Sequence, residues 1–424
     1  MKFRSTRDES ETVTVSEAIR RGLAPDGGLY VPRRLPVLDG EAFDGLEDDA
    51  DIARRLLEPF FEGDELAGQL GEICTDTYGF PVPLNDVGRG TRVLELFHGP
   101  TAAFKDVGAA FLASCMERME ARSDQPLTIL VATSGDTGAA VAAAFDGRDG
   151  CEVIVLYPKG RVSDRQETLL TCWGDNVTSV AVRGDFDDCQ RIVKEAFADR
   201  WWRQNRRLSS ANSINAGRLL PQMTYYATSS LRIWRETGKK PDFVVPTGNA
   251  GNVLACLYAR QMGLPTGRVV MATNENRPIT HYLATGEWKT FETRQTLASA
   301  MDVGNPSNFE RVLHHWPDVD ALREQVSAET VTDAVIEETI RRGPEEWGQV
   351  WDPHTACAVR IREKMDSQLA VVVSTAHPAK FPGVVEPLVG AEVPMPDQMA
   401  SMMERPTSVT EIDASLDALT AVVR

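Results

Sequence analysis

Residues 94–119 read LELFHGPTAAFKDVGAAFLASCMERM and decide the fold of the chain. A short apolar strand passes through the turn at residues 98–101 into a segment whose apolar residues recur at helical spacing. This pattern places Lys105 in the first turn of the helix. A strand followed by a tight turn and a helix is the repeating unit of parallel α/β proteins.

Lys105 is an unusual residue for the start of a helix. Backbone N–H groups there favour anions, and an ammonium group close to Phe97 and Phe104 is poorly hydrated. Both effects favour the neutral amine, which is the form that a Schiff-base lysine needs. The alternative is a lysine that reaches solvent from a surface turn, and only the remaining motifs can decide between the two.

The composition indicates a globular chain. It has 424 residues, of which 42% are hydrophobic, enough for two or three domains with substantial cores. Residues 1–22 contain no apolar run behind their charges, and no later segment has the apolar length of a membrane span. We therefore expect a soluble protein of the cytoplasm.

Charge and cysteine usage exclude several classes of function. The formal net charge of −17 disfavours nucleic acid and anionic membranes as partners. An anionic small molecule remains possible because a phosphate site is a local feature. The seven cysteines are scattered without a C-x-x-C pair, which argues for reduced core thiols and against a metal site.

The chain divides into three parts. Residues 1–90 contain a Gly-Pro-rich stretch and an acidic helical region, and a turn-rich segment closes this small leading domain. Residues 91–375 form the α/β core, with a smaller lobe at about 120–215, and residues 376–424 are a C-terminal extension. No internal repeat or low-complexity tract interrupts this order.

The core alternates apolar strands with glycine-bearing loops and helices, which is typical of parallel sheets covered by helices on both faces. In such folds ligands bind at the carboxyl ends of the strands. Ser163 and Gln166 have the spacing of a capping box for one of the helices. The expected strands lie at residues 127–132, 152–156, 177–182, 243–245, 269–272 and 369–373.

Two glycine-bearing loops have the character of anion sites. Residues 248–252, GNAGN, follow a buried strand and open a helix, so free N–H groups and the helix dipole face an anion. They lack the P-loop lysine and the dinucleotide spacing, which points away from nucleotides. Residues 134–138, SGDTG, supply hydroxyls at Ser134 and Thr137 and a carboxylate at Asp136. Read alone, either loop is also compatible with an ordinary strand-to-helix turn.

Three further segments carry polar groups that suit a binding site. Residues 212–218, NSINAGR, combine amide, hydroxyl and guanidinium groups that suit a phosphate dianion, although a capped helix with a surface arginine has the same pattern. Thr375 follows the last buried strand, where its hydroxyl could meet a ring nitrogen. His354 is either part of an active-site wall or a hydrogen-bonded core histidine.

Together these motifs resemble the threonine synthase family, in its longer microbial branch. The leading residues 27–32, GGLYVP, and residues 307–311, SNFER, are also similar to that family. The resemblance covers nearly the whole chain and rests on separate motifs in one order: HGPTAAFKD, SGDTG, NSINAGR, GNAGN and STAHPAKF.

The resemblance implies a pyridoxal 5'-phosphate enzyme of the tryptophan-synthase-β-like class, called fold type II, with a two-lobed parallel-sheet core and a small N-terminal domain. Lys105 would form the Schiff base with the cofactor, and Thr375 would face its pyridine nitrogen. Asp136 would stand beside the ring hydroxyl, where many relatives in the wider class have asparagine. The cofactor phosphate would be held by Gly248, Asn249, Ala250, Gly251 and Asn252, and the substrate by Ser134, Thr137, Asn212, Ser213 and Arg218.

The implied reaction is the conversion of O-phospho-L-homoserine and water to L-threonine and phosphate, by elimination at the γ carbon and addition of water at the β carbon, with Lys105 as proton shuttle. A phospho-lyase or serine/threonine dehydratase on the same fold remains open, as does a catalytically silent phosphometabolite-binding relative. A nicotinamide dehydrogenase is disfavoured by the missing G-x-G-x-x-G. We expect a monomer or a homodimer.

Overall fold

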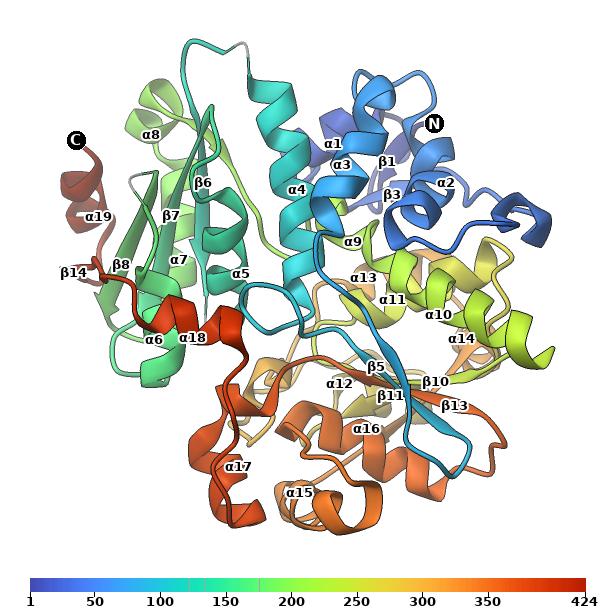
Figure 1. Cartoon of the computed structure of the whole chain (residues 1–424). Helices are drawn as coiled ribbons and strands as arrows, with labels where there is room; N and C mark the ends of the chain where they lie inside the picture. The colour runs from blue at the N-terminus through green and yellow to red at the C-terminus, as the bar shows by residue number, and fades with distance from the viewer. Residues whose placement is uncertain (122, 134, 175) are drawn as a thin grey trace.

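The computed structural model describes residues 1–121, 123–133, 135–174 and 176–424, and within them the strands form three sheets (Figure 1). The largest sheet is parallel except at one edge, where β4 pairs antiparallel with β5. Every residue of its central strands β10, β11 and β13 is buried, as expected for parallel strands covered on both faces. Its order is β12 (Val326–Thr330), β11 (Val269–Thr273), β10 (Asp242–Pro246), β13 (Ala370–Ser374), β5 (Thr91–Glu95) and β4 (Leu84–Asp86).

Alternate residues of the large sheet supply two separate cores, because successive side chains of a strand point to opposite faces. Phe243 and Val245 of β10 belong to one core with Leu254, whereas Val244 belongs to another with Ile361. Helix α11 (Gly251–Gln261) therefore covers the first face and α16 (Pro353–Lys364) the second. The other helices around this sheet are α9 (Ala216–Leu219), α10 (Gln222–Thr237), α12 (Pro278–Thr285), α13 (Phe309–His315), α14 (Val319–Gln325), α15 (Asp333–Trp347) and α17 (Pro382–Val389).

The smaller lobe holds a second sheet, in which all the strands are parallel. The C-terminal extension crosses to this lobe through α18 and adds the edge strand β14 and helix α19, coloured red at the left of Figure 1. The sheet order is β14 (Thr410–Asp413), β8 (Val177–Arg183), β7 (Cys151–Pro158), β6 (Leu127–Ala132) and β9 (Arg207–Ser209). Its helices are α5 (Asp136–Phe145), α6 (Asp164–Thr171), α7 (Phe186–Ala198), α8 (Arg200–Asn205), α18 (Asp397–Met403) and α19 (Leu416–Val423).

The two parallel sheets confirm the fold class and the strands expected from the sequence. The capping box at the start of α6 is also confirmed, since Ser163 and Gln166 exchange side-chain and backbone hydrogen bonds. The sequence did not predict that the end of the chain returns to pair with β8. Edge strand β14 is short and largely exposed, so it lacks the continuous apolar run that reveals a buried strand.

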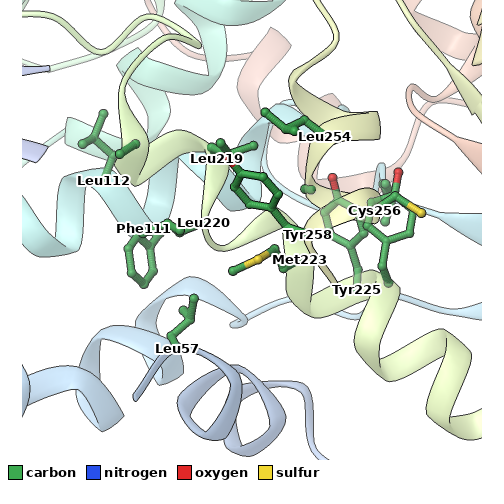
Figure 2. Close-up of a cluster of buried hydrophobic side chains, with 14 of the residues drawn as sticks. Leu57, Phe111, Leu112, Leu219, Leu220, Met223, Tyr225, Leu254, Cys256 and Tyr258 are labelled. Atoms are coloured by element: carbon green, nitrogen blue, oxygen red, sulfur yellow. The ribbon is translucent and has the colours of Figure 1, made fainter. Parts of the chain in front are cut away.

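The N-terminal part forms the third sheet and three helices. Its antiparallel sheet has the order β2 (Thr12–Val13), β1 (Phe3–Ser5) and β3 (Tyr30–Pro32). The helices α1 (Val15–Arg21), α2 (Asp49–Phe61) and α3 (Leu70–Thr77) pack beside it at the upper right of Figure 1. Figure 2 shows that Leu57 of α2 faces Phe111 of α4, so the N-terminal helices share a core with the rest of the chain.

Helix α4 (Lys105–Glu120) packs against three regions of the molecule: α3 of the N-terminal part, α5 of the smaller lobe and α9 beside the large sheet. Lys105 is its first residue, as the sequence predicted. At its other end the buried carboxylate of Glu120 pairs with Arg20 of α1 at 3.4 Å and with Arg207 of β9 at 2.5 Å. Because a buried carboxylate needs such partners, Glu120 joins the helix to the N-terminal part and to the smaller lobe.

Two properties of the described residues bear on the class of protein. The seven cysteines are all buried and unpaired. In this part of the chain no helix combines the length and apolar character that crossing a bilayer requires, and no group of three or more His, Cys, Asp or Glu side chains is arranged to hold a metal ion.

Arg311 of α13 is a fully buried cation that fastens three segments together. Its guanidinium donates to the carbonyl of Tyr30 in β3 at 3.0 Å, to the carbonyl of Ile214 at 2.6 Å and to the side chain of Asn308. Burial lowers the pKa of Arg311 to about 10, so it stays charged at neutral pH. The loop at residues 212–218 is thereby held against the N-terminal sheet.

We expect Arg311→Met to lower the free energy of unfolding by about 3 kcal/mol, because two carbonyls and an amide oxygen lose their donor in a buried place. Urea unfolding followed by circular dichroism measures the change. The matched control is Arg323→Met, since Arg323 also donates to two carbonyls but is 40% exposed, and its loss should change stability by less than about 1 kcal/mol. Equal effects of the two variants would contradict this account of Arg311.

Candidate active site at the carboxyl ends of the two sheets

Lys105 is placed by hydrogen bonds to the end of β13. The segment between β5 and α4 crosses in front of that strand, where the Leu96 N–H donates to the Ser374 carbonyl and the Phe104 N–H to the Thr375 carbonyl, both at 2.9 Å. A β-bridge between Ala103 and Ala376 completes the contact. The lysine therefore lies at the carboxyl end of the large sheet, the edge that the sequence predicted for ligand binding.

The carboxylate of Asp136 lies between two lysines. Its Oδ2 is 3.6 Å from Nζ of Lys105, and its Oδ1 accepts from Nζ of Lys380 at 2.9 Å and from Nε2 of Gln166 at 3.3 Å. Lys380 also donates to the Thr101 carbonyl at 2.8 Å. The side chains of Lys105, Asp136 and Lys380 are only 15%, 5% and 1% exposed, so the cluster is largely shielded from water.

Burial dominates the electrostatics of this cluster. Burial lowers the pKa of Lys105 by more than the negative charge of nearby Asp136 raises it. The positive charges of Lys380 and Arg218 lower the pKa of Lys105 further. This confirms the direction predicted from the sequence. Burial alone would raise the pKa of Asp136, but the ammonium groups of Lys380 and Lys105 hold it far below its usual range. Asp136 is therefore a fixed negative charge beside an amine that is poised to lose its proton.

Arg218 of α9 approaches α4 at Gly108, one turn after Lys105. A Cβ atom at Gly108 would lie only 2.8 Å from the Arg218 carbonyl oxygen and 3.0 Å from its Nε, so this contact requires glycine. The guanidinium donates to the Ala211 carbonyl at 2.7 Å, and its buried Nε has no partner among the described residues. Burial lowers the pKa of Arg218 to about 10 against the opposing charge of Asp106.

Residues 248–252 form a tight loop between β10 and α11. Ala250 adopts a left-handed conformation with φ of 62°, and a Cβ atom at Gly248 would lie 2.7 Å from Cα of Met301. Asn249 donates to the hydroxyl of Ser213 at 2.7 Å, which brings the GNAGN and NSINAGR segments together. The free N–H groups at the start of α11 therefore lie beside the polar side chains of residues 212–218.

Asn252, at the base of this loop, is held by two tyrosines. Its Oδ1 accepts from the hydroxyls of Tyr225 at 2.7 Å and Tyr226 at 2.6 Å. Its buried Nδ2 has no partner in the described part of the chain. A buried amide donor of this kind is typical of a group that meets a ligand or an ordered water.

The structure places the remaining predicted residues as follows. Thr375 is buried and follows β13, Thr137 lies half-buried in the first turn of α5, and the Asn212 N–H donates to the hydroxyl of Ser210. Ser134 lies outside the described residues. His354 bonds to Asp352 through Nδ1 at 2.8 Å and accepts from the Ala300 N–H through Nε2 at 3.1 Å, so it is a buried histidine with both ring nitrogens hydrogen-bonded.

Sequence reasoning missed Lys380 and Gln166. Lys380 stood inside a quoted motif, STAHPAKF, and its apolar neighbours Ala379 and Phe381 were a signal that its ammonium group would be buried. Gln166 was assigned only to the capping box, yet the same side chain also donates to Asp136. Neither partnership is local in sequence, so neither could be found by spacing.

Comparisons with known proteins give one answer over the whole chain. Residues 91–374 match the family described as pyridoxal-phosphate dependent enzyme, residues 2–78 match threonine synthase N terminus, and residues 355–423 match threonine synthase, C-terminal. The chain is 38% identical to a threonine synthase of Serratia marcescens over 423 residues, which cover 99% of this chain and 98% of that protein.

Solved structures agree with the sequence comparisons. The chain is similar to the crystal structure of a pyridoxal-phosphate-bound threonine synthase from Brucella melitensis, with a TM-score of 0.94 and 36% identity over 100% of this chain and 98% of that one. It is also similar to a threonine synthase structure from Escherichia coli, with a TM-score of 0.89, 36% identity and coverage of 100% and 99%.

The approach of Arg218 to Gly108 is testable through stability. Gly108→Ala should lower the free energy of unfolding by about 1–3 kcal/mol through overpacking, although alanine is the better helix former. Gly383 of α17 is the matched control, because nothing lies within 4 Å of a Cβ atom there and Gly383→Ala should be neutral or slightly stabilising. Urea midpoints measure both variants, and a stabilised Gly108→Ala protein would refute the close contact.

Proposed function

Because this chain belongs to the threonine synthase family of fold type II pyridoxal-phosphate enzymes, we propose that it converts O-phospho-L-homoserine and water to L-threonine and phosphate. The family membership covers the whole length of the chain. The observation that carries the proposal within the structure is the position of Lys105, largely shielded at the sheet edge, with its pKa lowered and a carboxylate beside it.

The residues present fit the cofactor in their chemistry. Three groups lie at the carboxyl ends of adjacent strands: a nucleophilic amine, a glycine-lined loop at a helix start, and a buried amide whose Nδ2 has no partner among the described residues. These groups suit the aldehyde, phosphate and ring of pyridoxal phosphate, respectively. In our proposal Lys105 bonds to the cofactor, the loop at residues 248–252 holds its phosphate, and Thr375 and Asp136 flank its ring.

The cofactor supplies an electron sink that stabilises negative charge on the substrate carbons. Lys105 would hold the cofactor through its amine nitrogen. As a neutral amine next to the substrate, Lys105 would also remove the proton at the α carbon and move protons at the β and γ carbons, because it has both reach and basicity. Asp136 retains its charge throughout and anchors this end of the site.

In our proposal, neutral hydrogen-bond donors and one arginine bind the phosphorylated substrate. We assign its phosphate and carboxylate to Ser134, Thr137, Asn212, Ser213 and Arg218. Arg218 is supported by a buried Nε that lacks a partner among the described residues, since an arginine fork suits a phosphate dianion. Ser213 is supported by its hydrogen bond with Asn249 of the adjacent loop.

Incubation of the purified protein with pyridoxal phosphate and O-phospho-L-homoserine tests this function. We expect inorganic phosphate and threonine to appear in equal amounts, measured by a colorimetric phosphate assay and by amino-acid chromatography. Phosphate accompanied by a 2-keto acid would instead indicate a lyase or a dehydratase. No phosphate release from a protein that has taken up the cofactor would reject the proposal.

Lys105→Ala is the matched variant for this assay. It should abolish turnover together with the visible absorbance of the bound cofactor, because both depend on the same amine. Circular dichroism shows whether the variant is folded. A folded variant that kept the absorbance and the activity would remove Lys105 from its assigned role.

Arg218→Gln should raise KM for O-phospho-L-homoserine by about tenfold to a hundredfold, because a charge-assisted contact to a phosphate contributes roughly 1.5–3 kcal/mol. The visible absorbance of the cofactor should remain, since Arg218 is not assigned to the cofactor. Steady-state kinetics with varied substrate measures the change. An unchanged KM would show that the substrate phosphate binds elsewhere.

A further inference from the structure

The site contains an apparent contradiction between Lys105 and Asp136. A carboxylate beside a lysine ordinarily stabilises the ammonium form, which is not nucleophilic. Yet Asp136 lies 3.6 Å from the amine that our proposed function requires to be neutral. Some other group must cancel the charge of Asp136 for the two residues to coexist.

Lys380 is placed to do so. Its Nζ is 2.9 Å from Oδ1 of Asp136, a hydrogen-bonded ion pair, whereas Lys105 faces the other oxygen from beyond hydrogen-bond distance. Lys380 is 1% exposed and is held in this position by the Thr101 carbonyl at 2.8 Å. Gln166 of the smaller lobe donates to the same oxygen of Asp136, so Oδ1 is fixed from two sides.

We propose that Lys380 is a positioning residue that occupies the carboxylate of Asp136, so that Lys105 remains a neutral nucleophile beside a buried acid. Its ammonium group acts in two ways: it pairs with Asp136 and it repels a second positive charge at Lys105. Lys380 makes no bond to substrate or cofactor in this role. The inference rests on the function proposed above, where the neutral amine is needed.

The other charged groups around the cluster do not neutralise the carboxylate of Asp136. Arg218 of α9 adds a positive charge that acts on Lys105 in the same direction as Lys380. Asp106 accepts from the N–H and hydroxyl of Thr101 and forms no ion pair with either lysine, although it is close enough to interact with the charges of Lys380 and Arg218. His354 of α16 has both ring nitrogens engaged elsewhere, Nδ1 with Asp352 and Nε2 with the Ala300 N–H, so it makes no hydrogen bond to Asp136.

Reductive methylation of the cofactor-free protein tests the proposal without using turnover. Formaldehyde and cyanoborohydride methylate only neutral amines, and the 15% exposed Lys105 is within reach of so small an aldehyde. Peptide mass spectrometry then gives the methylation rate of Lys105 against pH, with exposed Lys194 as internal reference. The midpoint of this profile reports the proton affinity of the Lys105 amine.

Lys380→Met should move the midpoint for Lys105 upward by about one pH unit or more, which is a roughly tenfold slower methylation below the midpoint. Lys380→Arg keeps the charge and should retain the original midpoint. Lys159→Met is the control, because Lys159 also pairs with a carboxylate, Glu411, but on the exposed surface, and it should leave Lys105 unchanged.

An unchanged or lowered midpoint in Lys380→Met overturns the proposal and leaves Lys380 as a structural contact of Thr101. If this variant does not fold, the pair Asp136→Asn and Asp136→Asn/Lys380→Met makes the same test without an unpaired buried carboxylate. The midpoint should be lower in the single variant, where the Lys380 charge still repels Lys105, and equal midpoints would overturn the proposal. Because no substrate is used, failure here is distinct from failure of the assay for threonine.

Discussion

The structure depends on the ion pair between Asp136 and Lys380, which joins the two lobes at the site. Asp136 begins α5 of the smaller lobe, and Lys380 follows β13 of the large sheet. Two buried charges cost several kcal/mol to desolvate, so such a pair is maintained only when further hydrogen bonds satisfy it. Gln166 and the Thr101 carbonyl supply those bonds. The hydrogen bonds that satisfy these two buried charges therefore also hold the two lobes together at the site.

Helix α4 connects the site to the rest of the molecule. Lys105 is its first residue, Gly108 admits Arg218 one turn later, and Glu120 pairs with arginines of two other parts at its far end. Helix α4 therefore connects the position of Lys105 to contacts with the N-terminal part and with the smaller lobe. The core in Figure 2, where Phe111 and Leu112 lie near Leu219 and Leu220, holds the same helix from the side.

The sequence predicted the parts of the fold whose signal is local. Buried parallel strands such as β10 are continuous apolar runs, and the glycines of residues 248–252 mark the turn that follows. The position of Lys105 in the first helical turn followed from apolar spacing in the same way. Strand β14 was missed because it is short, largely exposed and paired with β8, more than two hundred residues earlier.

The difference between local and long-range signals also explains which site residues the sequence predicted. Residue types and loop chemistry identified Lys105, Asp136 and Arg218 as candidates, because each stands in a turn or helix start with a recognisable pattern. Pairing of Asp136 with Lys380 could not be predicted, since the two residues are brought together only by the packing of one lobe on the other. The burial that lowers the pKa of Lys105, and the ammonium groups that lower the pKa of Asp136, are likewise properties of the folded chain.

A net charge of −17 does not prevent a local surplus of positive charge at the site. If Lys105 is neutral, as the proposed function requires, the cation of Lys380 is matched by Asp136. Arg218 donates to a carbonyl, and within the described residues no carboxylate forms an ion pair with it, since Asp106 accepts from Thr101 instead. The surplus positive charge of the site therefore resides on Arg218, next to the neutral donors of residues 212–213 and 248–252. The anion binding proposed above would depend on this guanidinium and on oriented N–H groups, since the acidic surface elsewhere is screened by salt within about 10 Å.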